Sequence, residues 1–182
     1  SFLMPNHPRS HIVMICTGTG SAPMRAMTEW RRRVRQSGKF EGGKLMLFFG
    51  ARTKEELPYF GPLQKVPDGL LRKHFAYSRI PGEEKRYVQD VMRQNAGEVG
   101  IMLKNPHTHV YLCGLRDMED GVEAAFSAIC KDLDIDWENS IAVVEWGNGM
   151  LDTIVDSWCE LVIDRGTTLD DDSRVVTLHA VG

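Results

Sequence analysis

The residues best suited to do chemistry form the run TGTGSAP, from Thr17 to Pro23. Gly18 and Gly20 let the backbone turn sharply and come close to a ligand. Pro23 suits the first turn of a helix, and the free N–H groups at the start of that helix attract an anion. This run therefore predicts a cradle for a pyrophosphate. A G-x-G spacing on its own also fits an ordinary tight turn between a strand and a helix.

The elements around this loop alternate regularly. Short apolar runs predict strands over 11–16, 44–50, 73–78 and 109–113, and amphipathic stretches predict helices over 23–36, 88–103 and 118–133. Strands that alternate with helices through short connections predict an α/β fold built on a doubly wound parallel sheet.

Further candidate residues follow the predicted strands. They are Arg52, Ser78-Arg79, Lys85-Arg86-Tyr87 and Cys113-Gly114. Because the carboxyl ends of parallel strands meet at one edge of the sheet, we expect these residues and the glycine loop to converge on one crevice.

The charge of this crevice favours a 2′-phosphate. Ser78, Arg79 and a further basic residue supply more positive charge than NADH requires, and an arginine can bind a phosphate through two hydrogen bonds. Sites for NAD usually place a carboxylate on the ribose 2′-hydroxyl, and none stands directly after the second predicted strand. The residues thus predict binding of NADP(H).

Composition narrows the remaining classes. The chain has 182 residues, enough for one α/β domain with at most a small appendage. Its four cysteines lie far apart without a CxxC pair, which favours a reducing compartment and argues against a zinc or other metal site. No apolar run reaches the length of a membrane span, and the basic residues are spread out. We therefore expect a cytoplasmic protein that binds neither membranes nor nucleic acid.

Four motifs in order resemble the NADP-binding half of the ferredoxin–NADP reductase family, over residues 1 to about 139. They are ICTGTGSAPMR, LFFGART, SR followed by KRYVQD, and YLCGLRDMEDGV, and within the family they are similar to benzoyl-CoA oxygenase (epoxidase) reductase components. The resemblance implies a ferredoxin reductase-like fold. The resemblance also implies a set of cofactor-binding residues, to which Arg52 is added because it follows the second predicted strand. The implied residues are Thr17, Gly18, Thr19, Gly20, Ser21, Ala22, Pro23, Ser78, Arg79, Lys85, Tyr87, Gln89, Gly114, Leu115 and Met118.

The same resemblance implies a flavin-dependent oxidoreductase. Hydride would pass from NADPH to FAD and electrons onward to an iron–sulfur carrier or oxygenase, with Cys113 and Glu119 as catalytic residues. The partners implied are a FAD-binding domain and that iron–sulfur carrier. Family members carry the FAD domain before the NADP-binding half, and this sequence shows no flavin site. The residues alone leave open whether Cys113 is a nucleophile or a small side chain packed beside the nicotinamide.

The composition changes near residue 140. The net charge is +3 through Asn139 and −6 from Ser140 onward, which predicts an NADP(H)-binding domain over 1–139 and a C-terminal strand with a β-rich tail over 140–182. The tail, with IAVVEWGNGMLDTIVDSWCELVID and RVVTLHAVG, resembles the C-terminal part of the TsaE family, ATPases that assist threonylcarbamoyl modification of tRNA. A Walker A loop, on which that family depends, is missing from the sequence.

Two interpretations of the tail remain at this point. The run 141–146 is either the fifth strand of the sheet, with strands over 158–164 and 174–180 added at its edge, or part of a loosely attached remnant in a chimeric chain. A short helix is expected over 151–156. The corresponding alternatives for function are a non-catalytic nucleotide-binding fragment and a TsaE-like accessory factor.

Overall fold

The computed structural model of this chain describes residues 4–5, 9–38, 42–56, 63–114, 116–136, 142–146, 158–165 and 174–181. The contacts of the backbone divide the chain into two units, one of Phe2–Gly147 and one of Asn148–Gly182 together with Ser1. None of the helices in these described ranges is long and apolar enough to cross a bilayer.

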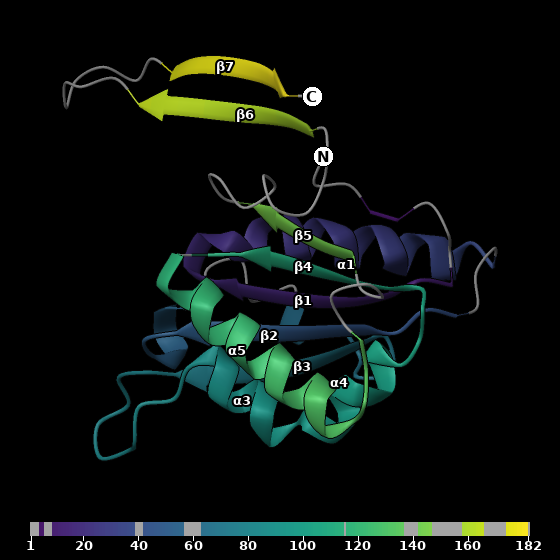
Figure 1. The fold of residues 1–182 in the computed structure, drawn as a ribbon, viewed down its shortest axis with the longest axis vertical. Coiled ribbons are helices and arrows are strands. Elements are labelled where there is room, and N and C mark those ends of the chain that lie inside the picture. The colour runs from purple at the N-terminus through teal and green to yellow at the C-terminus, as the bar shows by residue number, and fades with distance from the viewer. Residues whose placement is uncertain are drawn as a thin grey trace. The chain divides into compact units, whose positions relative to one another are not determined.

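The first unit is organised around a parallel sheet. Its five strands run in the order β3-β2-β1-β4-β5, as Figure 1 shows. They are β1 (His11–Thr17), β2 (Leu45–Ala51), β3 (Leu71–Tyr77), β4 (Thr108–Cys113) and β5 (Ala142–Trp146). The chain builds outward from β1 in one direction through β2 and β3, and then in the other through β4 and β5. The carboxyl ends of β1 and β4 therefore form a topological switch point, and the doubly wound α/β fold is confirmed.

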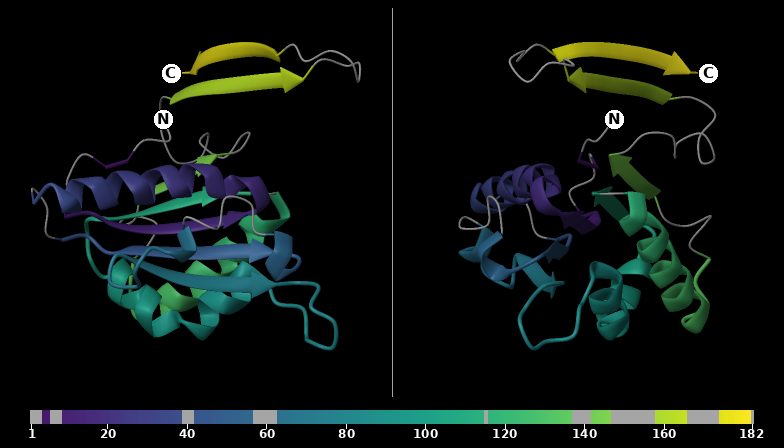
Figure 2. Two further views of the ribbon diagram at one scale, coloured as in Figure 1. Left: turned by 180° about the vertical axis from the view of Figure 1, so that it is seen from behind. Right: turned by 90° about the vertical axis from the view of Figure 1, so that its left-hand side faces the viewer.

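Helices cover both faces of this sheet (Figures 1 and 2). Helix α1 (Ser21–Gln36) lies on one face, and α3 (Val88–Gln94), α4 (Ala96–Leu103) and α5 (Arg116–Asp132) lie on the other. The interior of β1, residues 12–16, is fully buried, with alternate side chains in the two apolar clusters on either face. A strand covered on both faces reads as a continuous apolar run, which is why HIVMIC was recognisable in the sequence.

Helix boundaries differ from the sequence expectation at two places. The helix after the glycine loop begins at Ser21, because Gly18–Gly20 form a 3₁₀ turn that leads directly into it. The helix expected over 88–103 is two helices that meet at Asn95, where φ is −108° and ψ is 25°. The Asn95 side-chain amide donates a hydrogen bond of 2.7 Å to the carbonyl oxygen of Val91. Such local bonds are the reason that asparagine interrupts helices.

The structure decides between the two interpretations of residues 141–146 that the sequence left open. β5 pairs in parallel with β4, with Val143 opposite Val110, so this run is the fifth strand of the sheet. The expectation that the last two strands add at the edge of that sheet is wrong. β6 (Trp158–Arg165) and β7 (Arg174–Val181) pair antiparallel in a sheet of their own, with Leu161 opposite Leu178. Consecutive strands joined by a short connection satisfy each other's backbone groups in this way. The helix expected over 151–156 lies outside the described residues.

A buried arginine holds together the end of the sheet opposite the switch point. Arg31 of α1 is fully buried and donates hydrogen bonds to the carbonyl oxygens of Ser10, at 3.2 Å, and Gly43, at 3.4 Å. These two residues precede β1 and β2. A Cβ atom at Gly43 would lie 1.9 Å from the Ser10 carbonyl oxygen, so the two backbones pass each other closely there. The guanidinium thus ties α1 to the start of both strands.

We expect replacement of this arginine to weaken the whole domain. Arg31→Ala removes two charge-assisted hydrogen bonds and leaves buried carbonyl groups unpaired, which should lower the free energy of unfolding by about 1.5–3 kcal/mol. Arg33→Ala on the same helix is the matched control, because Arg33 is exposed and should change stability by less than about 0.5 kcal/mol. Urea unfolding followed by circular dichroism measures both. Equal effects of the two substitutions would contradict the structural role given to Arg31.

Candidate functional site

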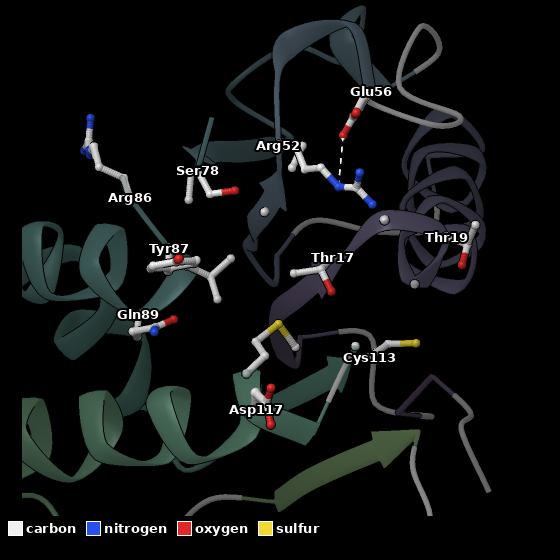
Figure 3. A pocket seen from close by; sticks show the side chains of 18 of the residues that line it. Thr17, Thr19, Arg52, Glu56, Ser78, Arg86, Tyr87, Gln89, Cys113 and Asp117 are labelled. Atoms are coloured by element: carbon white, nitrogen blue, oxygen red, sulfur yellow. Dashed lines mark ion pairs between the residues drawn. The ribbon is translucent and has the colours of Figure 1, made fainter. Parts of the chain in front are cut away.

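A cavity of about 1050 Å³ opens at the carboxyl ends of the central strands. Figure 3 shows it from close by, with the loop that carries Thr17 and Thr19 on one side and Ser78, Arg86 and Tyr87 on the other. Its lining comes from the ends of β1, β2, β3 and β4 and from the segments that follow them. The lining residues are Thr17, Gly18, Thr19, Gly20, Pro23, Gly50, Ala51, Arg52, Glu56, Ala76, Ser78, Arg86, Tyr87, Val88, Gln89, Cys113, Gly114, Asp117 and Met118.

The glycine loop depends on its glycines at two positions. Gly18 has a φ of +52°, in the left-handed region that side chains with a Cβ atom rarely adopt. At Gly20 a Cβ atom would lie 2.4 Å from the carbonyl oxygen of Cys113, so the loop passes directly against the end of β4. Ser21 is buried below the loop, and its hydroxyl donates a hydrogen bond of 3.0 Å to the carbonyl oxygen of Gly18. The loop is thus shaped by its own backbone before any ligand is bound.

Hydrogen bonds to the ends of β2 and β3 place the wall opposite the glycine loop. The N–H groups of Ser78 and Arg79 donate to the carbonyl oxygens of Ala51, at 3.1 Å, and Arg52, at 2.9 Å. The N–H of Arg86 returns to the carbonyl oxygen of Tyr77 at 3.1 Å, which closes the intervening loop at its base. Ser78 and Arg86 both line the cavity. The Arg86 side chain is exposed, like the charged side chains of the loop between them, and its guanidinium donates a hydrogen bond to the side-chain oxygen of Gln94.

One ion pair crosses the upper part of the cavity wall (Figure 3). Arg52 follows β2, and its Nε lies 3.7 Å from Oε2 of Glu56, in the short 3₁₀ helix η2 (Lys54–Glu56). More than half of the Arg52 side chain is exposed. An exposed ion pair of this kind contributes little energy, so the guanidinium can exchange Glu56 for a ligand phosphate at small cost.

The wall formed by the end of β4 is less polar than the wall that carries Ser78 and Arg86. Cys113 ends β4, and burial raises the pKa of its thiol, so the group is protonated at neutral pH. Gly114 follows, where a Cβ atom would lie 2.4 Å from the terminal methyl carbon of Met118 and 2.9 Å from the Thr17 hydroxyl oxygen. A flat ring could lie against this close-packed surface of backbone, thiol and thioether.

The cavity gathers most of the residues expected from the sequence. Thirteen of them line it: Thr17, Gly18, Thr19, Gly20, Pro23, Arg52, Ser78, Arg86, Tyr87, Gln89, Cys113, Gly114 and Met118. Five described ones lie outside the lining: Ser21, Ala22, Arg79, Lys85 and Glu119. Ser21 supports the loop from below, Glu119 is buried in the first turn of α5, and the other three are exposed. Leu115 is outside the described residues.

Several lining residues were missed by reasoning from the sequence. They are Gly50, Ala51, Glu56, Ala76, Val88 and Asp117. A signal existed for Gly50 and Ala76, since small residues at the ends of buried strands leave room for a ligand. At Gly50 a Cβ atom would come within 2.9 Å of the Thr17 methyl carbon. Of Lys85 and Arg86, which the sequence offered together, only Arg86 lines the cavity.

Comparison with known proteins agrees with this geometry. The family model for oxidoreductase NAD-binding domains matches residues 14–124, more than half of the chain. The chain belongs to the oxidoreductase NAD-binding domain family. The match begins within β1 and ends within α5, so it contains every residue that lines the cavity.

Curated relatives of this NAD-binding domain include reductases from cyanobacteria and plants. The chain is 34% identical over 145 residues to a ferredoxin–NADP reductase of Spirulina sp, covering 75% of the chain and 49% of that protein. It is 36% identical over 143 residues to the chloroplastic ferredoxin–NADP reductase of Spinacia oleracea, covering 74% and 38%. It is 38% identical over 117 residues to the inducible nitric oxide synthase of Sus scrofa, covering 62% and 10%. The chain thus spans half or less of the length of these relatives.

We expect the loop of this NAD-binding domain to reject a methyl group at Gly20. Gly20→Ala pushes a Cβ atom against the backbone of Cys113, and we expect a loss of about 1–3 kcal/mol in the free energy of unfolding. Gly97→Ala is the matched control, because Gly97 lies exposed in α4 with no atom within 4 Å of the added Cβ. That change should stabilise the domain by roughly 0.4–1 kcal/mol. Thermal unfolding compares the two variants, and an unchanged Tm for Gly20→Ala would contradict the close approach.

Proposed function

We propose that this chain is the NADP(H)-binding domain of a flavin-dependent oxidoreductase. One observation carries the proposal: a cavity at the switch point joins a glycine loop at a helix N-terminus to an opposite side lined by Ser78, Arg86 and Tyr87, with Arg52 between them. That combination suits a dinucleotide whose pyrophosphate lies on the loop and whose second phosphate lies on the opposite wall. The names of the plant and cyanobacterial relatives, which are NADP reductases, support the same cofactor.

The residues fit the cofactor along its length. Gly18 and Gly20 leave the space that a Cβ atom would fill, so the backbone of Thr17–Pro23 can hold the pyrophosphate, with Arg52 above it. We propose that Ser78, Arg79 and Lys85 or Arg86 bind the 2′-phosphate, and that Tyr87 and Gln89 lie beside the adenine. The exposed side chains of Arg79 and Lys85 are long enough to reach a phosphate at the rim of the cavity.

At the other end the protein orients the cofactor and excludes water. We propose that the nicotinamide lies against Cys113, Gly114 and Met118, with Glu119 nearby in α5. A protonated, half-buried thiol packs as a small apolar group there. Bound NADPH supplies a hydride to the FAD of the complete enzyme, which passes electrons to an iron–sulfur carrier. Orientation and burial of the ring are the contributions this chain makes.

The rest of the proposal concerns what surrounds this domain. We propose that the complete enzyme has a FAD-binding domain, which corresponds to the part of the relatives' length that this chain does not match. We further propose that residues 1–139 come from a reductase component of the benzoyl-CoA oxygenase type, and that 140–182 are a tail similar to TsaE. We propose that the protein works in the cytoplasm, with which its scattered cysteines are consistent, since Cys16, Cys113 and Cys130 of the described residues are free thiols.

The preference for NADP over NAD is testable at the 2′-phosphate wall. Arg79→Ala should weaken NADP binding by about tenfold to more than a hundredfold, the equivalent of a charge-assisted hydrogen bond of roughly 1.5–3 kcal/mol. Binding of NAD, which has no 2′-phosphate, should hardly change. Isothermal titration calorimetry with both dinucleotides measures this. Equal weakening of the two would overturn the assignment of the 2′-phosphate.

Two further variants sharpen the calorimetric test. Arg86→Ala tests the cation that the structure places in the cavity wall, and Arg33→Ala removes an exposed arginine of α1 that lies outside the lining. We expect a selective loss of NADP affinity for Arg86→Ala and none for Arg33→Ala. If Arg33→Ala weakened NADP as strongly as Arg79→Ala, general charge and not a specific contact would explain the effect.

We also expect this chain alone to be a poor diaphorase. Hydride transfer needs its acceptor held within about 3–3.5 Å of the nicotinamide, and we assign that task to the separate FAD domain. NADPH with free FAD and an electron-accepting dye should give little turnover. Saturable turnover at micromolar FAD would show that this chain holds flavin itself. Titration with Mg-ATP tests the TsaE-like alternative, because a TsaE-like accessory factor is expected to bind Mg-ATP tightly.

A further inference from the structure

Two cysteines face each other across the strands at the switch point. Cys16 of β1 and Cys113 of β4 are register partners in adjacent parallel strands. Both belong to the buried cluster on the α1 face of the sheet, so their side chains share one face. Adjacent strands lie about 4.8 Å apart, and disulfides join Cα atoms about 4.4–6.8 Å apart. The backbone therefore already has the separation that a disulfide requires.

The two thiols differ in their access to solvent. Cys16 is completely buried, whereas Cys113 is 9% exposed and lines the cavity. A small oxidant that enters the cavity reaches Cys113 first and finds Cys16 directly behind it. Both thiols are free. Burial raises the pKa of both, and for Cys16 the neighbouring Cys113 raises it further, so the pair reacts slowly and rests in the reduced form.

We propose that Cys16 and Cys113 form a thiol pair that hydrogen peroxide closes slowly to a disulfide beneath the glycine loop. The sulfur of Cys113 attacks one oxygen of hydrogen peroxide, the O–O bond breaks, and Cys113 becomes a sulfenic acid with release of water. The sulfur of Cys16 then attacks the Cys113 sulfur and expels the second water. Two thiols are oxidised, one peroxide is reduced, and the two thiol protons end in the two water molecules.

Closure of this disulfide would alter the cofactor site. A disulfide holds its Cβ atoms about 3.8 Å apart, closer than the spacing of parallel strands, so the ends of β1 and β4 must move together. Gly20 packs against this point, since its Cβ position lies 3.1 Å from the Cys113 sulfur. We expect the displaced loop to bind the dinucleotide less tightly. This consequence rests on the proposed function, whereas the disulfide itself does not.

Peptide mapping tests the disulfide without assuming any cofactor. The full chain with Cys159→Ser retains the three cysteines that are free in the structure. After treatment with hydrogen peroxide and alkylation of remaining thiols, trypsin should release peptides 10–25 and 105–116 as one species, two hydrogen atoms lighter than their sum. Dithiothreitol should separate them. Sulfinic acid at Cys113 without linkage, or linkage to Cys130, would overturn the proposal.

Two single substitutions provide the matched comparison. Cys16→Ala removes the resolving thiol, so Cys113 should accumulate as sulfenic and sulfinic acid. Cys130→Ala removes a buried thiol that lies in the cluster on the other face of the sheet, and should leave the linkage unchanged. An equal yield of cross-linked chain in all variants would show that the oxidation takes another route.

Calorimetry then separates this proposal from the proposed function. NADP should bind the oxidised protein about tenfold more weakly than the reduced protein, with recovery after dithiothreitol. Equal affinity of the two forms would overturn the effect on the site and leave the mapped disulfide standing. Failure of the reduced protein to bind NADP at all would contradict the proposed function, while the linkage between residues 16 and 113 would still decide the redox proposal.

Discussion

The close approach of the glycine loop to the end of β4 is the contact on which the site depends. Gly20 lies so near the Cys113 carbonyl oxygen that no Cβ atom fits between them. This contact brings together two segments almost a hundred residues apart, because β1 and β4 are neighbours in the sheet. It places the glycine loop on one side of the cavity and Cys113 on another. A parallel sheet that reverses its strand order creates such a meeting point by its topology.

The same contact places the glycine loop beside a pair of cysteines. Cys113 touches the loop, lines the cavity and faces Cys16 on the adjacent strand. The position of a Cβ atom at Gly20 would lie 3.1 Å from its sulfur, so no other element separates the loop from the thiol. The opposite wall is built differently, since the backbone hydrogen bonds of Ser78, Arg79 and Arg86 hold it to the ends of β2 and β3. Because backbone groups make these hydrogen bonds, the charged side chains of that wall can be substituted without disturbing the sheet.

A second structural contact lies at the other end of the domain. Arg31 ties α1 to the starts of β1 and β2, where the strands begin, and the cavity lies where the strands end. β6 and β7 form a two-stranded antiparallel sheet outside the matched family region. A two-stranded sheet by itself has little independent stability, so the stability of β6 and β7 depends on contacts beyond their own pairing.

The sequence by itself determined the fold class and most of the cavity. Buried parallel strands read as unbroken apolar runs, and a glycine loop before a helix is a local signal, so β1 to β4 and Thr17–Pro23 could be predicted from neighbouring residues alone. Tertiary structure decided the burial of Arg31, the place of Arg86 but not Lys85 in the cavity lining, and the facing of Cys16 and Cys113. These features depend on contacts between segments that are distant in the sequence, which local patterns do not encode. The structure also shows that β6 and β7 pair with each other and that a local hydrogen bond of Asn95 to Val91 accompanies the break between α3 and α4.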